Sequence, residues 1–505
     1  MEESTDMTTK EALTALTALE SELIAYEHAL GCLNYDAETV APRNSAPARG
    51  RVVAFLSGIV HERITSPRTG EALDALLSEK DSLPLIDRRR AEVLKEQRDD
   101  LTIVPAEEYM AYQQLMAEAI QVWHDAKLSS DYPAYAPYLD KIIAYNRRFA
   151  ARKDANRPAY DVLLDGYEKG LSHETLDPFF ALLRRELTPL ILEVAKCPRP
   201  DTAFLHRTYP IYLQRRFTDR VMRIMGIDRD DCAVGETEHP FTTGFNRHDV
   251  RITTHYHEDD VLSSLFSVVH EGGHALYELG IGDELQGTIL ATGSAMSIHE
   301  SQSRFYENLI GRSRPFCAVL LPELKALFPE QMAGVDVEAL YRAANLSEPS
   351  LIRTEADELT YSIHVMIRYE IEKAMIEGAL ETKDIPGEWN RMYREYLGVD
   401  VPDDRRGCLQ DSHWSFGAIG YFPSYALGSA YGVQMLANME KDVDVWGAVR
   451  AGSLKPITAW LGEKIHRYGQ LLTPDELVLN SCGGPFDPNC YVAYLKKKYG
   501  ELYNL

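Results

Sequence analysis

Apolar residues recur every three or four positions over most of this chain, which is the spacing of an amphipathic helix. The pattern is clear from the start, at Leu13, Leu16, Leu19 and Leu23. It continues, with charged opposite faces, over residues 88–101, 106–126 and 138–153. The pattern predicts a mainly helical N-terminal region over about residues 1–200.

One stretch in the middle of the chain departs from helical spacing. Residues 236–254 contain proline, glycine and several threonines, and β-type alternation is confined to 249–256. Short β structure is expected there. Helical spacing resumes at Asp260 and continues almost to the C-terminus, with no flexible linker. We therefore expect an all-α fold with a minor β-sheet, formed as one large domain over residues 1–505.

Composition and charge exclude several classes of protein. A content of 45% hydrophobic and 26% charged residues is typical of globular proteins and excludes extensive disorder. The net charge of −24 would repel nucleic acid and anionic lipid. No apolar run approaches the roughly 18 residues of a membrane span, and the acidic start of the chain lacks the features of a secretory signal. Neither a nucleic acid nor a membrane is expected as a partner, and a cytoplasmic location is expected.

The seven cysteines are odd in number and show no repeated C-x-x-C spacing. This spacing argues against both a disulfide framework and a thiolate zinc site. Reduced thiols are therefore expected, as is usual in the cytosol.

Histidines are concentrated in the second half of the chain, where seven of the 15 lie between residues 239 and 299. Residues 270–274 read H-E-G-G-H, and in the H-E-x-x-H pattern two imidazoles one helical turn apart bind one zinc ion. Asp259 and Asp260 can each cap a helix here, and Gly280 can end it. Glu271 then lies beside His270 and His274, where it can take a proton from water at the metal without being a ligand.

Two glycines inside this helix need a reason. Gly272 and Gly273 each cost about 1 kcal/mol relative to alanine. The cost is easier to understand if backbone or substrate approaches closely at that point. The alternative is a pair of structural histidines on an ordinary helix of a metal-free scaffold or binding protein.

A catalytic zinc ion needs a third protein ligand. A third histidine of the H-x-x-G-x-x-H type is excluded because Tyr277 stands at the glycine position. Glu278 lies one turn beyond His274, too far along the axis to complete the site. Glu300 is favoured, because a second helix expected over 294–311, capped by Thr292 or Ser294, can approach from the side.

Neighbours of these carboxylates are candidates for supporting roles. Glu278 is expected to accept a hydrogen bond near the site or to be a surface charge. His299 and Gln302, beside Glu300, are candidates to orient the ligands or a substrate, or are simply satisfied polar groups.

Two further segments carry candidate chemistry. Residues 347–350 indicate a helix start, with an amphipathic run to about Glu377. Arg353 would then oppose the helix dipole, so a compensating anion is expected, namely Glu355, Asp357 or a bound carboxylate. Residues 407–421 are expected to form a loop, in which His413 and Tyr421 are candidates to donate hydrogen bonds to a tetrahedral oxyanion.

Together these motifs resemble the carboxypeptidase Taq family of metallocarboxypeptidases. The segments that agree, in order and approximate spacing, are 239–241 (HPF), 249–253 (DVRIT), 270–274, 299–302 (HESQ), 352–357 and 407–414. Residues 35–39 are similar to the family's W-D-x-x-T, with Tyr35 in place of tryptophan.

The resemblance implies a two-lobed, nearly all-helical homodimer with a deep central groove and with the catalytic motifs in residues 239–421. By the same resemblance, zinc or cobalt is bound by His270, His274 and Glu300, and Glu271 is the general base. Arg353 would anchor a terminal carboxylate. His413 and Tyr421 would act in catalysis, and His239, Arg251 and Gln302 in substrate binding.

The activity implied by the resemblance is removal of single residues from peptides with a free C-terminus, with broad specificity and poor action on proline. A zinc endopeptidase or oligopeptidase of similar lobed architecture is the alternative. It would use the same metal centre without a carboxylate anchor.

Overall fold

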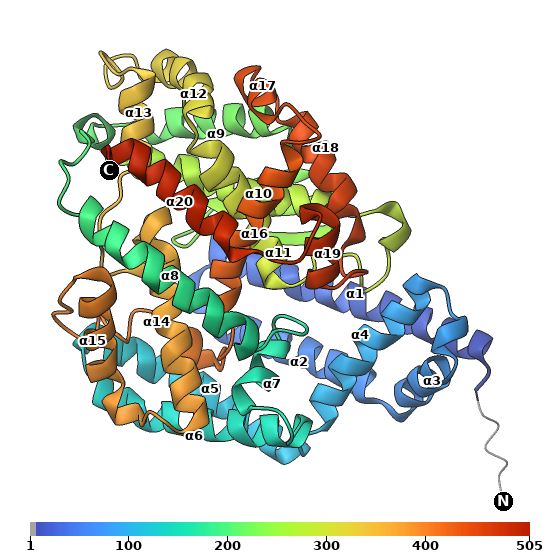
Figure 1. Cartoon of the computed structure of the whole chain (residues 1–505). Helices are drawn as coiled ribbons and strands as arrows, with labels where there is room; N and C mark the ends of the chain where they lie inside the picture. Colours follow the sequence, from blue (N-terminus) through green and yellow to red (C-terminus); the bar gives the residue numbers. More distant parts are fainter. Residues whose placement is uncertain (1–6) are drawn as a thin grey trace, which may run out of the picture.

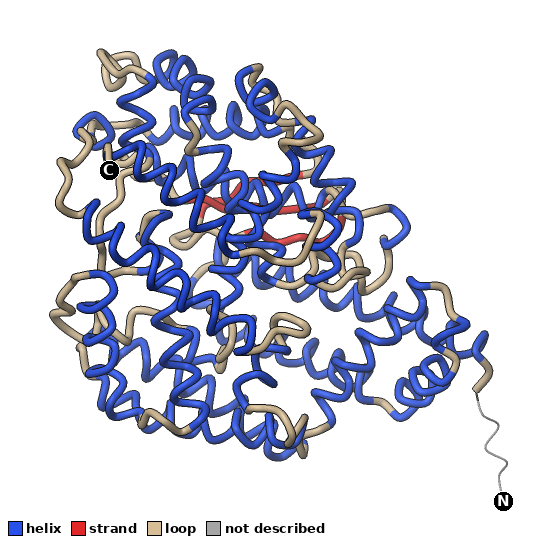
Figure 2. Tube along the Cα trace, viewed as in Figure 1, coloured by secondary structure: helices blue, strands red, loops and turns tan. Residues whose placement is uncertain are grey.

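A computed structural model describes residues 7–505, and helices make up most of it (Figures 1 and 2). The first four helices pack around a small hydrophobic core of their own, with Leu16, Leu73 and Leu94 at its centre. Arg90 ties this unit together by donating a hydrogen bond of 2.9 Å to the buried Glu20. These helices are α1 (Thr9–Thr39), α2 (Ala46–Thr65), α3 (Pro67–Ser78) and α4 (Leu85–Thr102).

A second, larger core runs continuously through the rest of the chain, from α5 to α20. Helices occupy most of residues 9–194, and they divide between the two cores. In Figure 1 the helices of the larger core gather into an upper and a lower group, and α8 crosses between them. Its first helices are α5 (Ala106–Ser129), α6 (Tyr132–Lys153), α7 (Ala159–Asp165), α8 (His173–Val194) and α9 (Ile211–Met225).

The expected β structure is a three-stranded sheet in the order β1-β3-β2. β3 is parallel to β1 and antiparallel to β2, so β2 is an edge strand. Val250 and Ile252 are fully buried on β3, which packs against α10, while α1 contacts β2. The strands are β1 (Cys232–Glu236), β2 (Thr242–Asn246) and β3 (Asp249–Thr254).

The helix that carries the H-E-x-x-H motif, α10 (Val261–Leu279), begins and ends where its sequence predicts. The side chain of Asp260 accepts hydrogen bonds from the backbone N–H groups of Leu262 and Ser263, and Gly280 follows the last turn. Of the two predicted cap carboxylates, Asp260 is confirmed and Asp259 is not used, and the predicted stop at Gly280 is confirmed.

The second predicted helix is α11 (Met296–Arg304), which continues as a π-helical segment, Phe305–Gly311. The expected caps are wrong, because neither Thr292 nor Ser294 caps it. A buried carboxylate from the loop after α7 does so instead, since Glu168 accepts hydrogen bonds of 2.6 Å from both the backbone N–H and the hydroxyl of Ser297.

The remaining helices complete the large core around α16, which packs against α11. They are α12 (Arg314–Leu327), α13 (Val337–Ala344), α14 (Glu358–Glu377), α15 (Ile385–Leu397), α16 (Pro423–Met439), α17 (Val445–Arg450), α18 (Lys455–Lys464), α19 (Pro474–Cys482) and α20 (Pro488–Tyr503). Within residues 7–505 no helix has the length and apolar character needed to cross a membrane. All seven cysteines, which lie in this range, are free thiols.

Candidate metal centre

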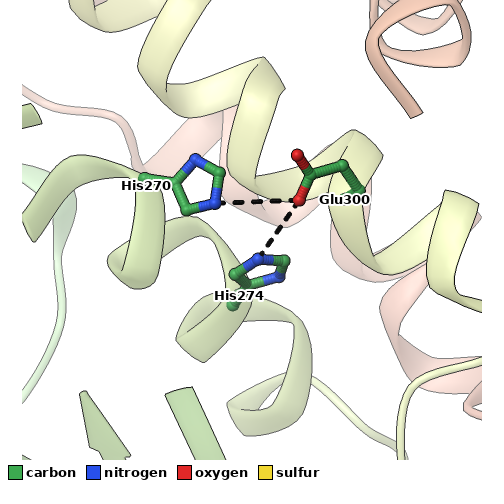
Figure 3. A group of neighbouring side chains, drawn as sticks. All are labelled: His270, His274 and Glu300. Atoms are coloured by element: carbon green, nitrogen blue, oxygen red, sulfur yellow. Dashed lines mark ion pairs between the residues drawn. The ribbon is translucent and has the colours of Figure 1, made fainter. Parts of the chain in front are cut away.

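Two helices bring the predicted ligands together (Figure 3). His270 and His274 project from the same side of α10, and Glu300 reaches toward both rings from α11. The Glu300 Oε2 atom lies 3.7 Å from His270 Nε2 and 3.5 Å from His274 Nε2. The imidazoles keep 19% and 13% of their side-chain surface exposed, so the group is accessible.

The spacing of these three atoms suits a small divalent ion. Two ligand atoms, each about 2.1 Å from a tetrahedral ion, lie about 3.4 Å apart. The nitrogen–oxygen separations of 3.5 and 3.7 Å are close to that value. Among the His, Cys, Asp and Glu residues of the described part of the chain, these three form the group whose ligand atoms lie close enough together to hold a metal ion.

A neighbouring arginine orients the Glu300 carboxylate. Arg304 Nε donates to Glu300 Oε1 at 2.7 Å, which leaves Oε2 directed at the two imidazoles. Burial alone would raise the pKa of Glu300, but Arg304 and the histidines outweigh it and hold that pKa well below its ordinary value. The carboxylate is therefore charged, as a metal ligand must be.

The π-helical segment supplies the partner of His270. Glu307 Oε2 lies 2.9 Å from His270 Nδ1 and also accepts from Arg304, while Oε1 accepts from Arg312. A carboxylate at Nδ1 keeps the proton on that nitrogen and leaves Nε2 free to bind a metal. π-Helical turns occur often at functional sites, and this one brings Glu307 onto the side of His270.

Glu271 lies next to the ligands but is oriented by the edge strand. The hydroxyl of Thr242, in β2, donates to Glu271 Oε2 at 2.6 Å. Burial raises the pKa of Glu271, because only 6% of the residue is exposed. The arrangement leaves a carboxylate of increased basicity beside the three candidate ligands, which is suited to proton transfer.

Arg353 lies in a buried charge cluster and not in a helix's first turn. It falls in a short 3₁₀ turn, and α14 begins only at Glu358, capped by Asp357, so the predicted helix start is wrong. Neither Glu355 nor Asp357, the two predicted side-chain partners, pairs with Arg353, whereas the predicted bound carboxylate stays a prediction. The side chain of Asp411 pairs with Arg353 and with Arg368, at 2.8 Å in each case.

A family model for the carboxypeptidase Taq (M32) metallopeptidases matches residues 15–499. The chain belongs to this family. It is a metallocarboxypeptidase, and as such a peptide hydrolase that depends on a divalent metal.

Relatives and solved structures of carboxypeptidases are similar over nearly the whole chain. Carboxypeptidase 1 of Bacillus subtilis is 38% identical, with 95% of this chain and 96% of that protein covered. Thermostable carboxypeptidase 1 of Thermus thermophilus is 35% identical, with the same coverage. The crystal structure of an M32 carboxypeptidase from Deinococcus radiodurans is 35% identical, with a TM-score of 0.95 over 98% of this chain and 100% of that one.

The other predicted catalytic residues of the carboxypeptidase lie in an aromatic cluster. His413 Nε2 is 3.2 Å from the hydroxyl of Tyr425, its Nδ1 is buried without a hydrogen-bond partner, and burial lowers its pKa to about 4. Tyr421 packs edge-on against Tyr425, and burial raises its pKa to about 12. Both side chains are neutral near pH 7, so each is able to donate a hydrogen bond, and their roles stay predictions.

The other predicted substrate-binding residues of the carboxypeptidase lie on three different elements. His239 is exposed in the loop between β1 and β2. Arg251 pairs with Asp249 and lines a 910 Å³ cavity beside α1. Gln302 is fully buried, and its amide binds Ser301 and His466. Gln302 has no surface available to a substrate in this structure, and its role in substrate binding stays a prediction.

The sequence reasoning missed three residues of this metallocarboxypeptidase centre. Glu307 follows Glu300 by seven positions, which is two helical turns, and that spacing was an available signal. Thr242 and Asp411 contact Glu271 and Arg353 from distant segments. Asp411 lies within the matching segment 407–414, but no local pattern indicated its partner, and none indicated Thr242.

Proposed function

We propose that this carboxypeptidase removes single residues from free peptide C-termini, using zinc, or else cobalt, held by His270, His274 and Glu300. The observation that carries the proposal is the convergence of two Nε2 atoms and one carboxylate oxygen beside Glu271. A divalent ion bound there lowers the pKa of water toward about 7 and polarises the scissile carbonyl.

Glu271 is the proposed general base and then the general acid. Its carboxylate takes a proton from the attacking water and returns that proton to the nitrogen of the leaving residue. The hydrogen bond from Thr242 restrains the carboxylate in one orientation, so the proton moves along a fixed direction. This preorganisation is the contribution of the edge strand to turnover.

Arg353 is the proposed anchor for the terminal carboxylate of the peptide. The buried cluster holds two guanidinium groups and one carboxylate, and so carries a surplus positive charge. A guanidinium has five N–H donors. Arg353 uses three of them, one on each nitrogen, to bind Asp411 and Tyr361, so two donors are spare. The surplus charge and the spare donors both favour an additional carboxylate as a ligand.

The experiment follows the products released from one peptide with a free C-terminus and from its C-terminally amidated form. We expect a ladder of single-residue losses from the free peptide, little reaction with the amidated one, and no reaction after chelation. Internal cleavage of both peptides would instead support the endopeptidase alternative.

Broad side-chain specificity, poor action on proline, a homodimer and a cytoplasmic location are further parts of the proposal, supported by membership of the family. Product ladders from peptides that differ only in the last residue test the first two. Light scattering of the purified enzyme tests the third.

A further inference from the structure

The two candidate histidine ligands are supported by different kinds of partner. His270 Nδ1 faces a carboxylate, that of Glu307. His274 Nδ1 instead faces another imidazole, with 2.6 Å between it and His299 Nδ1. The other nitrogen of His299, Nε2, lies 2.8 Å from Oε1 of Glu278.

We propose that His299 is a positioning residue that connects Glu278 to His274 and fixes the tautomer in which His274 presents an unprotonated Nε2 to the metal. The proposal rests on the proposed role of His274 as a ligand. It also gives Glu278 a function, as the carboxylate at the end of a two-imidazole chain.

The positions of the protons follow from the chemistry of the groups. An ionised carboxylate only accepts hydrogen bonds, so His299 Nε2 carries the proton directed at Glu278. The proposed state has a neutral His299, whose single N–H is the one on Nε2, so that Nδ1 is an acceptor. The proton in the 2.6 Å contact then belongs to His274 Nδ1. This leaves a lone pair on His274 Nε2, the atom that faces Glu300 Oε2.

The surrounding chain holds this arrangement in place. The backbone N–H of Gly293 donates to Glu278 Oε1 at 2.9 Å, and the ring of Tyr277 lies 5.0 Å from that of His299. A Cβ on Gly293 would lie 2.5 Å from His299 Cδ2. Any side chain at residue 293 would therefore displace the imidazole, although it would remove none of the hydrogen-bonding atoms.

Four variants separate the parts of the chain of hydrogen bonds. His299→Leu removes both the acceptor and the donor. His299→Asn keeps an acceptor oxygen near the position of Nδ1 but loses the donor to Glu278. Glu278→Gln removes the charge and keeps an acceptor, and Gly293→Ala displaces the ring and crowds Tyr277 without removing a hydrogen-bonding atom. His248→Leu is the control, because His248 is exposed and pairs only with Asp231.

The first readout is the affinity of the metal-depleted full-length enzyme for Zn²⁺, measured by competition with a chelator. We expect His299→Leu to weaken binding by about 10- to 100-fold, the usual effect of losing a partner of a metal-bound histidine. The Zn²⁺ affinity of His299→Asn should be close to that of the wild type. The affinities of Glu278→Gln and Gly293→Ala should lie between those of His299→Leu and the wild type, and that of His248→Leu should equal the wild-type value.

The second readout reports on the tautomer directly. In the Co²⁺-loaded enzyme, each histidine bound through Nε2 gives a shifted, solvent-exchangeable Nδ1–H proton signal. We expect two such signals in the wild type, and in His299→Leu loss or fast exchange of the one from His274, while the one from His270 persists.

Unchanged Zn²⁺ affinity with both signals retained in His299→Leu would overturn the proposal, and so would equal losses in His299→Leu and His299→Asn. If His299→Leu fails to fold, Glu278→Gln and Gly293→Ala carry the test, and wild-type affinity in both would overturn it. A wild-type enzyme that takes up neither metal would overturn the ligand assignment itself, which is a different result.

Discussion

Gly273 of α10 touches the backbone of Gln302 in α11, so closely that a Cβ on Gly273 would lie 2.7 Å from the Gln302 carbonyl oxygen. On the other side of α11, a Cβ on Gly428 would lie 2.8 Å from Cβ of Glu300. The helix that carries Glu300 is thus held between two glycine contacts. The distance between the Glu300 carboxylate and the two imidazoles therefore depends on these two glycine contacts.

Gly273→Ala should force α11 away from α10, because backbone atoms cannot move aside as a flexible side chain can. We expect a loss of about 1 to 3 kcal/mol of stability and weaker metal binding. Gly272→Ala is the matched control, since its Cβ would meet the flexible end of Met225 and alanine favours the helix. Thermal unfolding and Zn²⁺ titration of both variants measure the difference. Equal effects would show that the close approach at Gly273 is unimportant.

Glu271→Gln should lower kcat by roughly 10²- to 10⁴-fold, the usual contribution of a general base. Metal content should stay at the wild-type level, because Glu271 is not among the candidate ligands. Steady-state kinetics and metal analysis of the same preparation check both statements. Wild-type turnover in this variant would remove the assigned role.

Asp411→Asn should be strongly destabilising, because it leaves the buried guanidinium groups of Arg353 and Arg368 without their counter-charge. Removing one partner of a buried ion pair costs about 3 to 5 kcal/mol. Asp403→Asn, at an exposed pair with Arg406, is the control and should change stability by less than about 1 kcal/mol. Denaturant unfolding compares the two, and similar small losses would contradict the account of the cluster.

Glu168 should make stability depend on pH. Burial raises the pKa of this carboxyl from 4.5 to about 7. The folded state therefore holds the proton more tightly than the unfolded state, and the contribution of the group is lost as pH rises from about 4.5 to 7. Because a tenfold change in proton affinity is worth about 1.4 kcal/mol, the loss of stability approaches about 3 kcal/mol.

Glu168→Gln tests this dependence, because glutamine can bind both groups of Ser297 without titrating. We expect the wild type to lose thermal stability relative to this variant between pH 5 and about 7. Exposed Glu174→Gln should change nothing across that range. Parallel curves for Glu168→Gln and the wild type would refute the prediction.

Local sequence signals determined the parts of the site that lie on one element. The Asp260 cap, the Gly280 stop and the position of the two imidazoles on one helical face all follow from residues a few positions apart. Glu300 could be favoured over Glu278 by geometry alone. Gly272 and Gly273 indicated a close approach, and the structure shows at Gly273 that backbone is what approaches.

Contacts between distant segments were not predictable in this way. Glu168 caps a helix that begins more than a hundred residues later, and Asp411 neutralises an arginine in a separate turn. Periodicity reports which side of an element is buried, but not which other element covers it. The helix start predicted at residues 347–350 was wrong for the same reason. This segment resembles a helix cap, but in the folded protein the cap of α14 is Asp357.

The π-helical turn at Phe305–Gly311 makes the centre sensitive to the number of residues between its carboxylates. One residue fewer between Glu300 and Glu307, with the π-helical winding kept, would rotate all that follows by about 100° relative to Glu300. Glu307 and Arg312 would then face away from His270 even though every functional side chain was still present. Deletion here is thus expected to be more damaging than most substitutions.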